Sequence, residues 1–135
     1  MKTTTLFAAT AILFSSSIFA SSGETAFNNL CSSCHSTQGQ SGIAPPIFGV
    51  IDHVKKAHPE RDDFIQTVVD WVNNPTKEKT LMPGAVDKFG VMPKLGYPEE
   101  QVREVAEYLF DGGLSQPVWY QEHRRKAHRG GRHQH

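Results

Sequence analysis

Two cysteines and a histidine stand together as Cys31-Ser-Ser-Cys34-His35, and this motif occurs once in the chain. Two thiols at this spacing lie near each other on one helical turn, so both sulfurs can form thioethers to the two vinyl groups at one edge of a porphyrin. The imidazole that follows can then bind the iron at the centre of the ring. The motif therefore predicts one covalently attached haem c, with His35 as the proximal axial ligand.

A Cys-x-x-Cys pair has two other common uses. A redox-active disulfide normally opens a helix that follows a strand, and no strand or hairpin pattern is recognisable in this chain. A zinc site needs two further ligands, and the body of the chain offers only His53 and His58. A thiol–disulfide oxidoreductase stays a remote alternative to a haem protein.

Residues 1–22 have the layout of a secretory signal peptide. Lys2 precedes an apolar run over residues 6–14, and small residues follow at positions 20–22. The run is shorter than the roughly 20 residues that span a bilayer. We expect cleavage after Ala20 or Ser22, export to the periplasm, and no stable membrane insertion of the processed chain. An uncleaved anchor is the alternative.

Apolar periodicity predicts three helices, at about residues 24–30, 59–73 and 98–111. Pro59 and Pro98 suit the first turn of the second and third helices, while Pro75 and Gly112 mark their ends. The stretches 36–54 and 75–97 are rich in Gly and Pro and are expected to be loops. Loops of that length count against a compact domain unless they enclose something other than protein. A haem satisfies this condition.

Two methionines, Met82 and Met92, are each followed by proline. A thioether is a soft donor that favours Fe(II) and raises the reduction potential, so either residue is a candidate sixth ligand. A second histidine, His53 or His58, is the alternative. Such a bis-histidine site would normally lower the potential.

The order of these features resembles the class I c-type cytochromes. A haem motif, a Gly/Pro loop, a middle helix, a Met-Pro segment and a final helix with an aromatic–Leu pair follow one another over residues 23–113. The resemblance implies an all-α cytochrome c fold, with three to four short helices and long loops wrapped around one haem. It also implies that the first and last helices cross at Gly23, Phe27 and Tyr108 or Leu109.

The resemblance assigns two further site residues. Met92 stands shortly before Pro98, where the family places its sixth ligand, which leaves Met82 as the alternative ligand or as apolar filler near the ring. Pro45 matches the proline whose carbonyl accepts a hydrogen bond from the proximal imidazole, a contact that tunes the iron. The alternative for Pro45 is a stiff turn with Pro46.

Residues 114–135 lie outside the resemblance. Residues 121–135 carry five basic residues and one acidic residue, a net charge of +4, and no aliphatic side chain larger than alanine. We expect a disordered basic tail. Metal capture and electrostatic docking are its alternative roles; the candidate metal ligands are His123, His128, His133 and His135.

These observations predict a signal peptide (1–22), a cytochrome c domain (23–113) and a tail (114–135). Residues 23–120 carry a net charge of −5, and the neutral total provides no basic field for nucleic acid. We expect a periplasmic electron carrier rather than an enzyme, cycling between Fe(III) and Fe(II) and docking weakly on redox protein partners. The alternative is a haem subunit or domain of an oxidoreductase, peroxidase-like or gas-binding, with an open sixth site.

Overall fold

Helices form all the regular secondary structure in the part of the chain that the structure describes. A computed structural model describes residues 18–39 and 42–130, and these contain no strand. The elements in chain order are α1 (Ile18–Leu30), α2 (Ile47–Ala57), α3 (Arg61–Asn73), the 3-10 turn η1 (Lys77–Lys79), α4 (Pro83–Phe89), α5 (Glu99–Phe110) and α6 (Val118–Gly130). The expected all-α class is confirmed, with more helices than the three to four predicted.

The N-terminal helix begins inside the segment expected to be a signal peptide. Residues 1–17 lie outside the described residues, and α1 passes through both expected cleavage points, Ala20 and Ser22. None of the described helices combines the length and the apolarity needed to cross a membrane. Cleavage and export therefore stay predictions.

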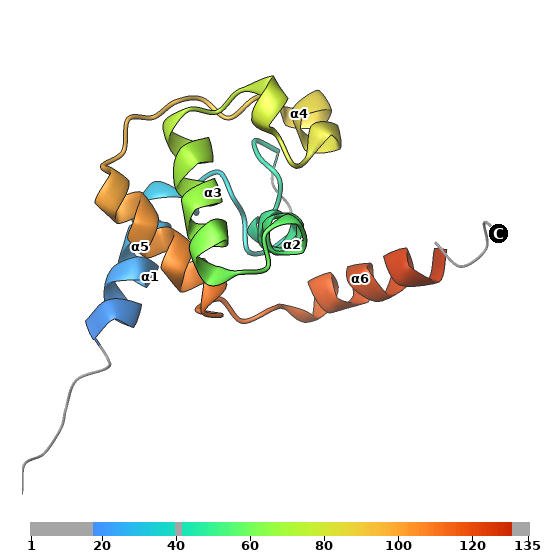
Figure 1. Ribbon diagram of the computed structural model, residues 1–135. Helices are drawn as coiled ribbons and strands as arrows, with labels where there is room; N and C mark the ends of the chain where they lie inside the picture. The colour runs from blue at the N-terminus through green and yellow to red at the C-terminus, as the bar shows by residue number, and fades with distance from the viewer. Residues whose placement is uncertain (1–17, 40–41, 131–135) are drawn as a thin grey trace, which may run out of the picture.

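Helices α1 and α5 cross at a glycine (Figure 1). A Cβ placed on Gly23 would lie 2.6 Å from Tyr108 Cβ and 2.7 Å from the Glu104 carbonyl oxygen, so no side chain fits there. One turn further along α1, Phe27 is fully buried, and its ring centroid lies 6.3 Å from that of Tyr108. The crossing expected at Gly23, Phe27 and Tyr108 is confirmed.

The core lies where α3 and α2 pack against α5. The apolar stripe of α5 is buried along its whole length; its residues are Val102, Val105, Ala106 and Leu109. The apolar face of α3 is divided between two surroundings. Phe64, Ile65 and Val69 are buried in the core, whereas Val68, Trp71 and Val72 are only partly buried and line a cavity described below.

Two helices lie in stretches that were expected to be loops. Pro46 caps α2 at its N-terminus, where a missing N–H costs nothing, and Ile47, Phe48, Ile51 and Val54 give that helix a buried face. Pro83 is the first residue of α4, and Gly90 ends that helix with a φ of +81°, a conformation that favours glycine. Pro46, Pro83 and Gly90, which contributed to the prediction of loops, are therefore helix boundaries.

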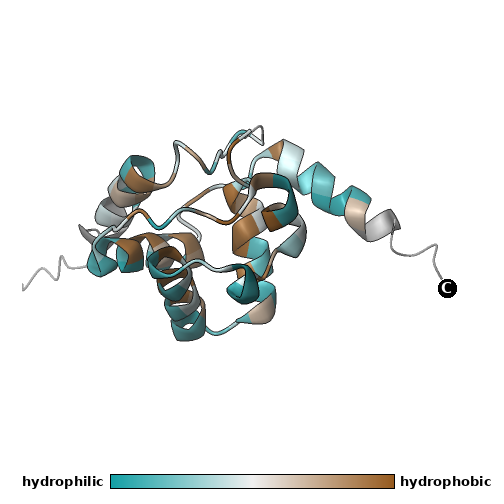
Figure 2. Cartoon of the chain, turned by 90° about the horizontal axis from the view of Figure 1, so that it is seen from above, coloured by the Kyte–Doolittle hydropathy of each residue, from teal (hydrophilic) through white to brown (hydrophobic). Residues whose placement is uncertain are grey.

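The C-terminal segment differs from the expected disordered tail in its described part. Helix α6 starts at Val118, and Tyr120 is buried with 6% of its surface exposed, packed against α2. Beyond that anchor the helix leaves the body (Figure 1) and is largely hydrophilic (Figure 2). For the described part the expectation of disorder was wrong, because it was based on residues 121–135, which cannot form a core, and did not include the aromatic residues before them.

Metal capture by the tail is not supported by the described residues. They contain no group of three or more His, Cys, Asp or Glu side chains placed to hold a metal ion. His133 and His135 lie outside the described residues, so this role stays a prediction.

The helix crossing provides a stability test. A methyl group added in Gly23→Ala meets a Cβ and a backbone oxygen, so the two helices must separate. We expect a loss of about 1–3 kcal/mol in the free energy of unfolding, measured by thermal or denaturant melts of the haem-loaded protein.

The matched control is Gly84→Ala in α4, because a Cβ there meets nothing within 4 Å. Alanine is the better helix former, so this variant should be unchanged or slightly more stable. Equal stabilities for the two variants would contradict close packing at the crossing.

Candidate haem-binding site

An apolar cavity of about 340 Å³ lies at the centre of the body. Helices α1 to α5 all contribute to its wall, as do the segments on either side of α4. Its volume and mainly apolar lining are typical of a site for a cofactor or small molecule. The stretches 36–54 and 75–97, which were expected to wrap around a haem, supply much of this wall.

Large apolar side chains at the cavity are left partly in water. Ile43 is 68% exposed and Leu95 46% exposed, and Leu81 and Val91 are also exposed while lining the same cavity. Exposed apolar side chains gathered at one place normally mark a surface that binds something. A planar apolar group seated among them would cover the exposed surface, so the lining fits a porphyrin.

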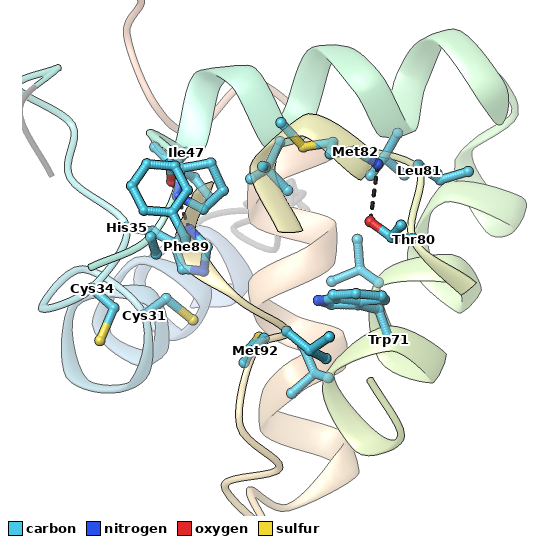
Figure 3. Close-up of a pocket in the computed structure, with 18 of the residues that line it drawn as sticks. Cys31, Cys34, His35, Ile47, Trp71, Thr80, Leu81, Met82, Phe89 and Met92 are labelled. Atoms are coloured by element: carbon cyan, nitrogen blue, oxygen red, sulfur yellow. Dashed lines mark hydrogen bonds between the residues drawn. The ribbon is translucent and has the colours of Figure 1, made fainter. Parts of the chain in front are cut away.

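The cysteine–histidine motif continues the last turn of α1. The backbone N–H of Cys31 donates to the Phe27 carbonyl at 2.9 Å, and the N–H of His35 donates to the Cys31 carbonyl at 2.9 Å. These turns bring Cys31, Cys34 and His35 to one wall of the cavity, facing Trp71, Thr80 and Leu81 across it (Figure 3). All three residues therefore line the same space.

The environment of Cys31 disfavours thiol redox catalysis. Burial, and after it the neighbouring Cys34, raise the pKa of the Cys31 thiol to about 11. Catalytic cysteines of disulfide oxidoreductases have lowered pKa values, because the thiolate is the nucleophile. The described residues also contain no strand leading into the motif. Both observations favour attachment of a group over disulfide exchange.

The imidazole of His35 is oriented by a proline carbonyl. His35 Nδ1 lies 2.9 Å from the Pro45 oxygen, which is the contact expected for this proline. A carbonyl can only accept, so Nδ1 carries the proton and Nε2 keeps its lone pair. Burial lowers the pKa of His35 and outweighs the hydrogen bond to Pro45, which raises it, so the ring is neutral at pH 7. A neutral imidazole with a free Nε2 is a ligand for iron.

Both candidate methionines line the cavity. Met82 caps the N-terminus of α4, and its backbone N–H donates to Thr80 Oγ1 at 3.0 Å (Figure 3). Its methyl carbon lies 3.9 Å from a Cβ placed on Gly49, so Met82 packs towards α2. Met92 lies in the extended segment before α5, which Tyr97 ties to α1 by donating to the Leu30 carbonyl at 3.1 Å. The geometry thus brings two thioethers to one cavity.

The two histidines of the alternative ligand pair lie elsewhere. Neither His53 nor His58 lines the cavity, and His53 is an exposed residue whose Nδ1 donates to the Gly49 carbonyl at 2.8 Å. This arrangement does not support a bis-histidine site.

Several cavity residues were not identified from the sequence. Trp71 lies on the apolar face of the middle helix, where helical spacing fits a core residue as well as a residue beside the haem, and the structure places it at the cavity. Thr80, Leu81 and Phe89 also line the cavity (Figure 3). They lie in a stretch whose Gly and Pro content hid its periodicity, so no sequence pattern indicated them.

These features define a c-type haem protein: helices as the regular structure of the described residues, a Cys-x-x-Cys-His motif opening into an apolar cavity, and a partly buried neutral imidazole. The model of the family described as Cytochrome c matches residues 20–111. The chain therefore belongs to the cytochrome c family, and this membership implies a covalently bound haem c. The cavity lining and the three motif residues fit that group.

One curated relative shares part of this sequence. A protein of Aquifex aeolicus (strain VF5), named as an uncharacterized protein, is 43% identical over 70 residues. The match covers 50% of this chain and 46% of the relative, so the chain spans about half the length of that protein. No solved structure matches the chain.

The exposed lining predicts what happens when the haem is not attached. In Cys31→Ser/Cys34→Ser the apolar cavity stays open to water, so we expect the variant to bind an apolar fluorescent dye that the haem-loaded parent does not bind. It should also melt earlier, by about 4–8 °C for each kcal/mol of lost stability.

The control for this test is Ser32→Ala/Ser33→Ala, since neither serine lines the cavity. It should retain haem and exclude the dye. A cysteine double variant that excludes the dye and melts with the parent would contradict a haem-filled cavity.

Proposed function

We propose that this cytochrome is an exported monohaem electron carrier of the class I type, with His35 and Met92 as its axial ligands. The observation that supports it most is the pairing of a neutral, Pro45-oriented imidazole with methionine thioethers in one apolar cavity. With both axial positions filled by side chains, no site is left for a substrate. Electron transfer then needs no bond to be made or broken at the iron.

The chain's own residues would set the conditions for that transfer. When bound, the haem supplies a one-electron Fe(III)/Fe(II) couple. The apolar wall excludes water and disfavours the additional charge of the ferric state, and a thioether ligand acts in the same direction. The cavity mouth, where Ile43 and Leu95 are exposed, is the place for close approach of a redox partner.

We favour Met92 over Met82 because the two methionines are differently engaged. The backbone of Met82 is committed to α4, since its carbonyl accepts from the N–H groups of Ala85 and Val86 at 3.0 and 3.1 Å, and its side chain packs towards α2. Met92 belongs to no helix. Its segment can therefore adjust to bring the sulfur to the iron at low cost.

Partners and location follow from the charge distribution and the N-terminus. Residues 23–120 are net acidic, which favours a partner with a basic docking face and a weak encounter that depends on ionic strength. The signal-peptide layout of residues 1–22 supports a periplasmic location, where haem c proteins meet their donors and acceptors.

Carbon monoxide distinguishes a carrier from a ligand-binding haem protein. We expect the absorption spectrum of the reduced protein to be unchanged by carbon monoxide at neutral pH, because a side chain already occupies the sixth position. Immediate conversion of the native ferrous protein to a carbon monoxide complex would indicate an open site and a peroxidase-like or gas-binding role.

The choice of methionine is tested by two matched substitutions. Met92→Ala should abolish the weak near-infrared band of the sulfur–iron bond, lower the reduction potential and open the protein to carbon monoxide. Met82→Ala removes the same side chain from the other wall of the cavity and should keep the band. Loss of the band in Met82→Ala alone would assign the ligand to Met82.

A further inference from the structure

The chain continues beyond the family match at residue 111 and packs back against α2. The ring of Tyr120 lies 5.4 Å from that of Phe48, and its hydroxyl lies 2.6 Å from Asp52 Oδ2 and 2.9 Å from the Phe48 carbonyl oxygen. Burial, then the hydrogen bond to Asp52, raise the pKa of Tyr120 above its ordinary range. Tyr120 is thus a neutral hydroxyl, with one hydrogen to donate, within hydrogen-bond distance of two acceptors on the first turns of α2.

Trp119 packs against a second segment, the backbone at Gly39. A Cβ placed on Gly39 would lie 2.8 Å from the indole ring, so the ring lies directly against the Gly39 backbone. Gly39 has a φ of +81°, which also favours glycine there. The indole in turn packs edge-on against Phe48 at 6.4 Å and against Tyr120 at 5.4 Å.

These two contacts lie a few residues after each partner of the His35–Pro45 hydrogen bond. Gly39 follows the donor His35 by four residues, and Phe48 follows the acceptor Pro45 by three. Between these points the Ile47 N–H donates to the Ser36 carbonyl at 3.3 Å, which joins the backbone of the donor to that of the acceptor. The Trp119–Tyr120 pair therefore contacts the two chain segments that carry the partners of this hydrogen bond. The positions of these segments determine where the Pro45 oxygen lies relative to the imidazole.

We propose that Trp119 and Tyr120 are positioning residues for the proximal ligand, acting through Gly39 and Phe48 to hold the His35–Pro45 hydrogen bond. The inference rests on the proposed axial role of His35. An imidazole that donates from Nδ1 is a more basic ligand and stabilises Fe(III), which lowers the reduction potential. Loosening the aromatic pair lengthens this bond and raises the potential.

Two readouts test this role in the haem-loaded full chain. Tyr120→Phe keeps the ring and removes both hydroxyl contacts. We expect a positive shift of the reduction potential and a several-fold faster solvent exchange of the His35 Nδ1 proton, followed by NMR. Trp119→Ala should shift both quantities in the same direction, and Trp119→Phe, which keeps a ring over Gly39, should restore values closer to those of the parent.

Tyr108→Phe is the matched control. It also removes one phenolic hydroxyl that donates to a backbone carbonyl, that of Gly113 at 2.8 Å, but at the C-terminal end of α5. It should leave the potential and the proton exchange unchanged. A potential and exchange rate identical to the parent in both Tyr120→Phe and Trp119→Ala, with only a lower melting temperature, would overturn the positioning role.

A different measurement would contradict the proposed function. The haem content and the axial-ligand spectrum of the parent report His35 ligation independently of the tail. If the parent shows no histidine-ligated haem, the electron-carrier proposal fails. If it does show one and the potentials of the variants do not move, only the role of Trp119 and Tyr120 fails.

Discussion

The apolar cavity is the constraint on which the rest of the structure depends. Helices normally bury one apolar face against each other, but α3 divides its face between the core and the cavity, with Val68 and Trp71 turned to the cavity. Apolar side chains such as Ile43 and Leu95 are left exposed at its edge. A chain built in this way gains its full stability only when the cavity is filled, so haem attachment and folding are thermodynamically linked. Covalent attachment of the haem c that the family implies, which we predict at Cys31 and Cys34, would keep the cavity filled permanently.

Burial and the Pro45 hydrogen bond shift the pKa of His35 in opposite directions, but both favour an imidazole that can bind iron. Burial lowers the pKa of the imidazole and keeps it neutral, which a metal ligand requires. The Pro45 carbonyl favours the proton on Nδ1 and so leaves the lone pair of Nε2 free for the axial role that we propose. Burial alone would leave the tautomer undefined, and the hydrogen bond alone would favour the charged ring. Their combination gives a single ligating state before the iron binds.

Sequence patterns predicted the parts of this protein that depend on local rules. The buried stripe of α5 follows from helical periodicity, while the crossing at Gly23 and the Pro45 contact came from a family resemblance. Helices α2 and α4 were missed because Gly49, Pro46 and Pro83 predict loops in isolation, although each is tolerated where it stands. The docking of the C-terminal segment could not be predicted, because it joins groups far apart in the sequence. Nothing local to Tyr120 indicates that Asp52 and the Phe48 carbonyl will lie beside its hydroxyl.

Helix α6 has two parts: an aromatic anchor, formed by Trp119 and Tyr120, and a basic arm that continues beyond it. Tyr120 buries its ring on the body and Trp119 is partly buried there. Beyond them the helix carries exposed basic residues, and among its described side chains Arg124 forms an ion pair with Asp52 of the body at 3.3 Å. A surface ion pair of this kind contributes about 0–1 kcal/mol, so the aromatic residues provide most of the attachment. The partner of Arg124, Asp52, is also the carboxylate beside the Tyr120 hydroxyl, so the arm meets the anchor at one side chain. The acidic body and the basic arm are thus joined at Asp52, and a change of charge at Arg124 would reach the aromatic anchor that we propose holds the proximal hydrogen bond.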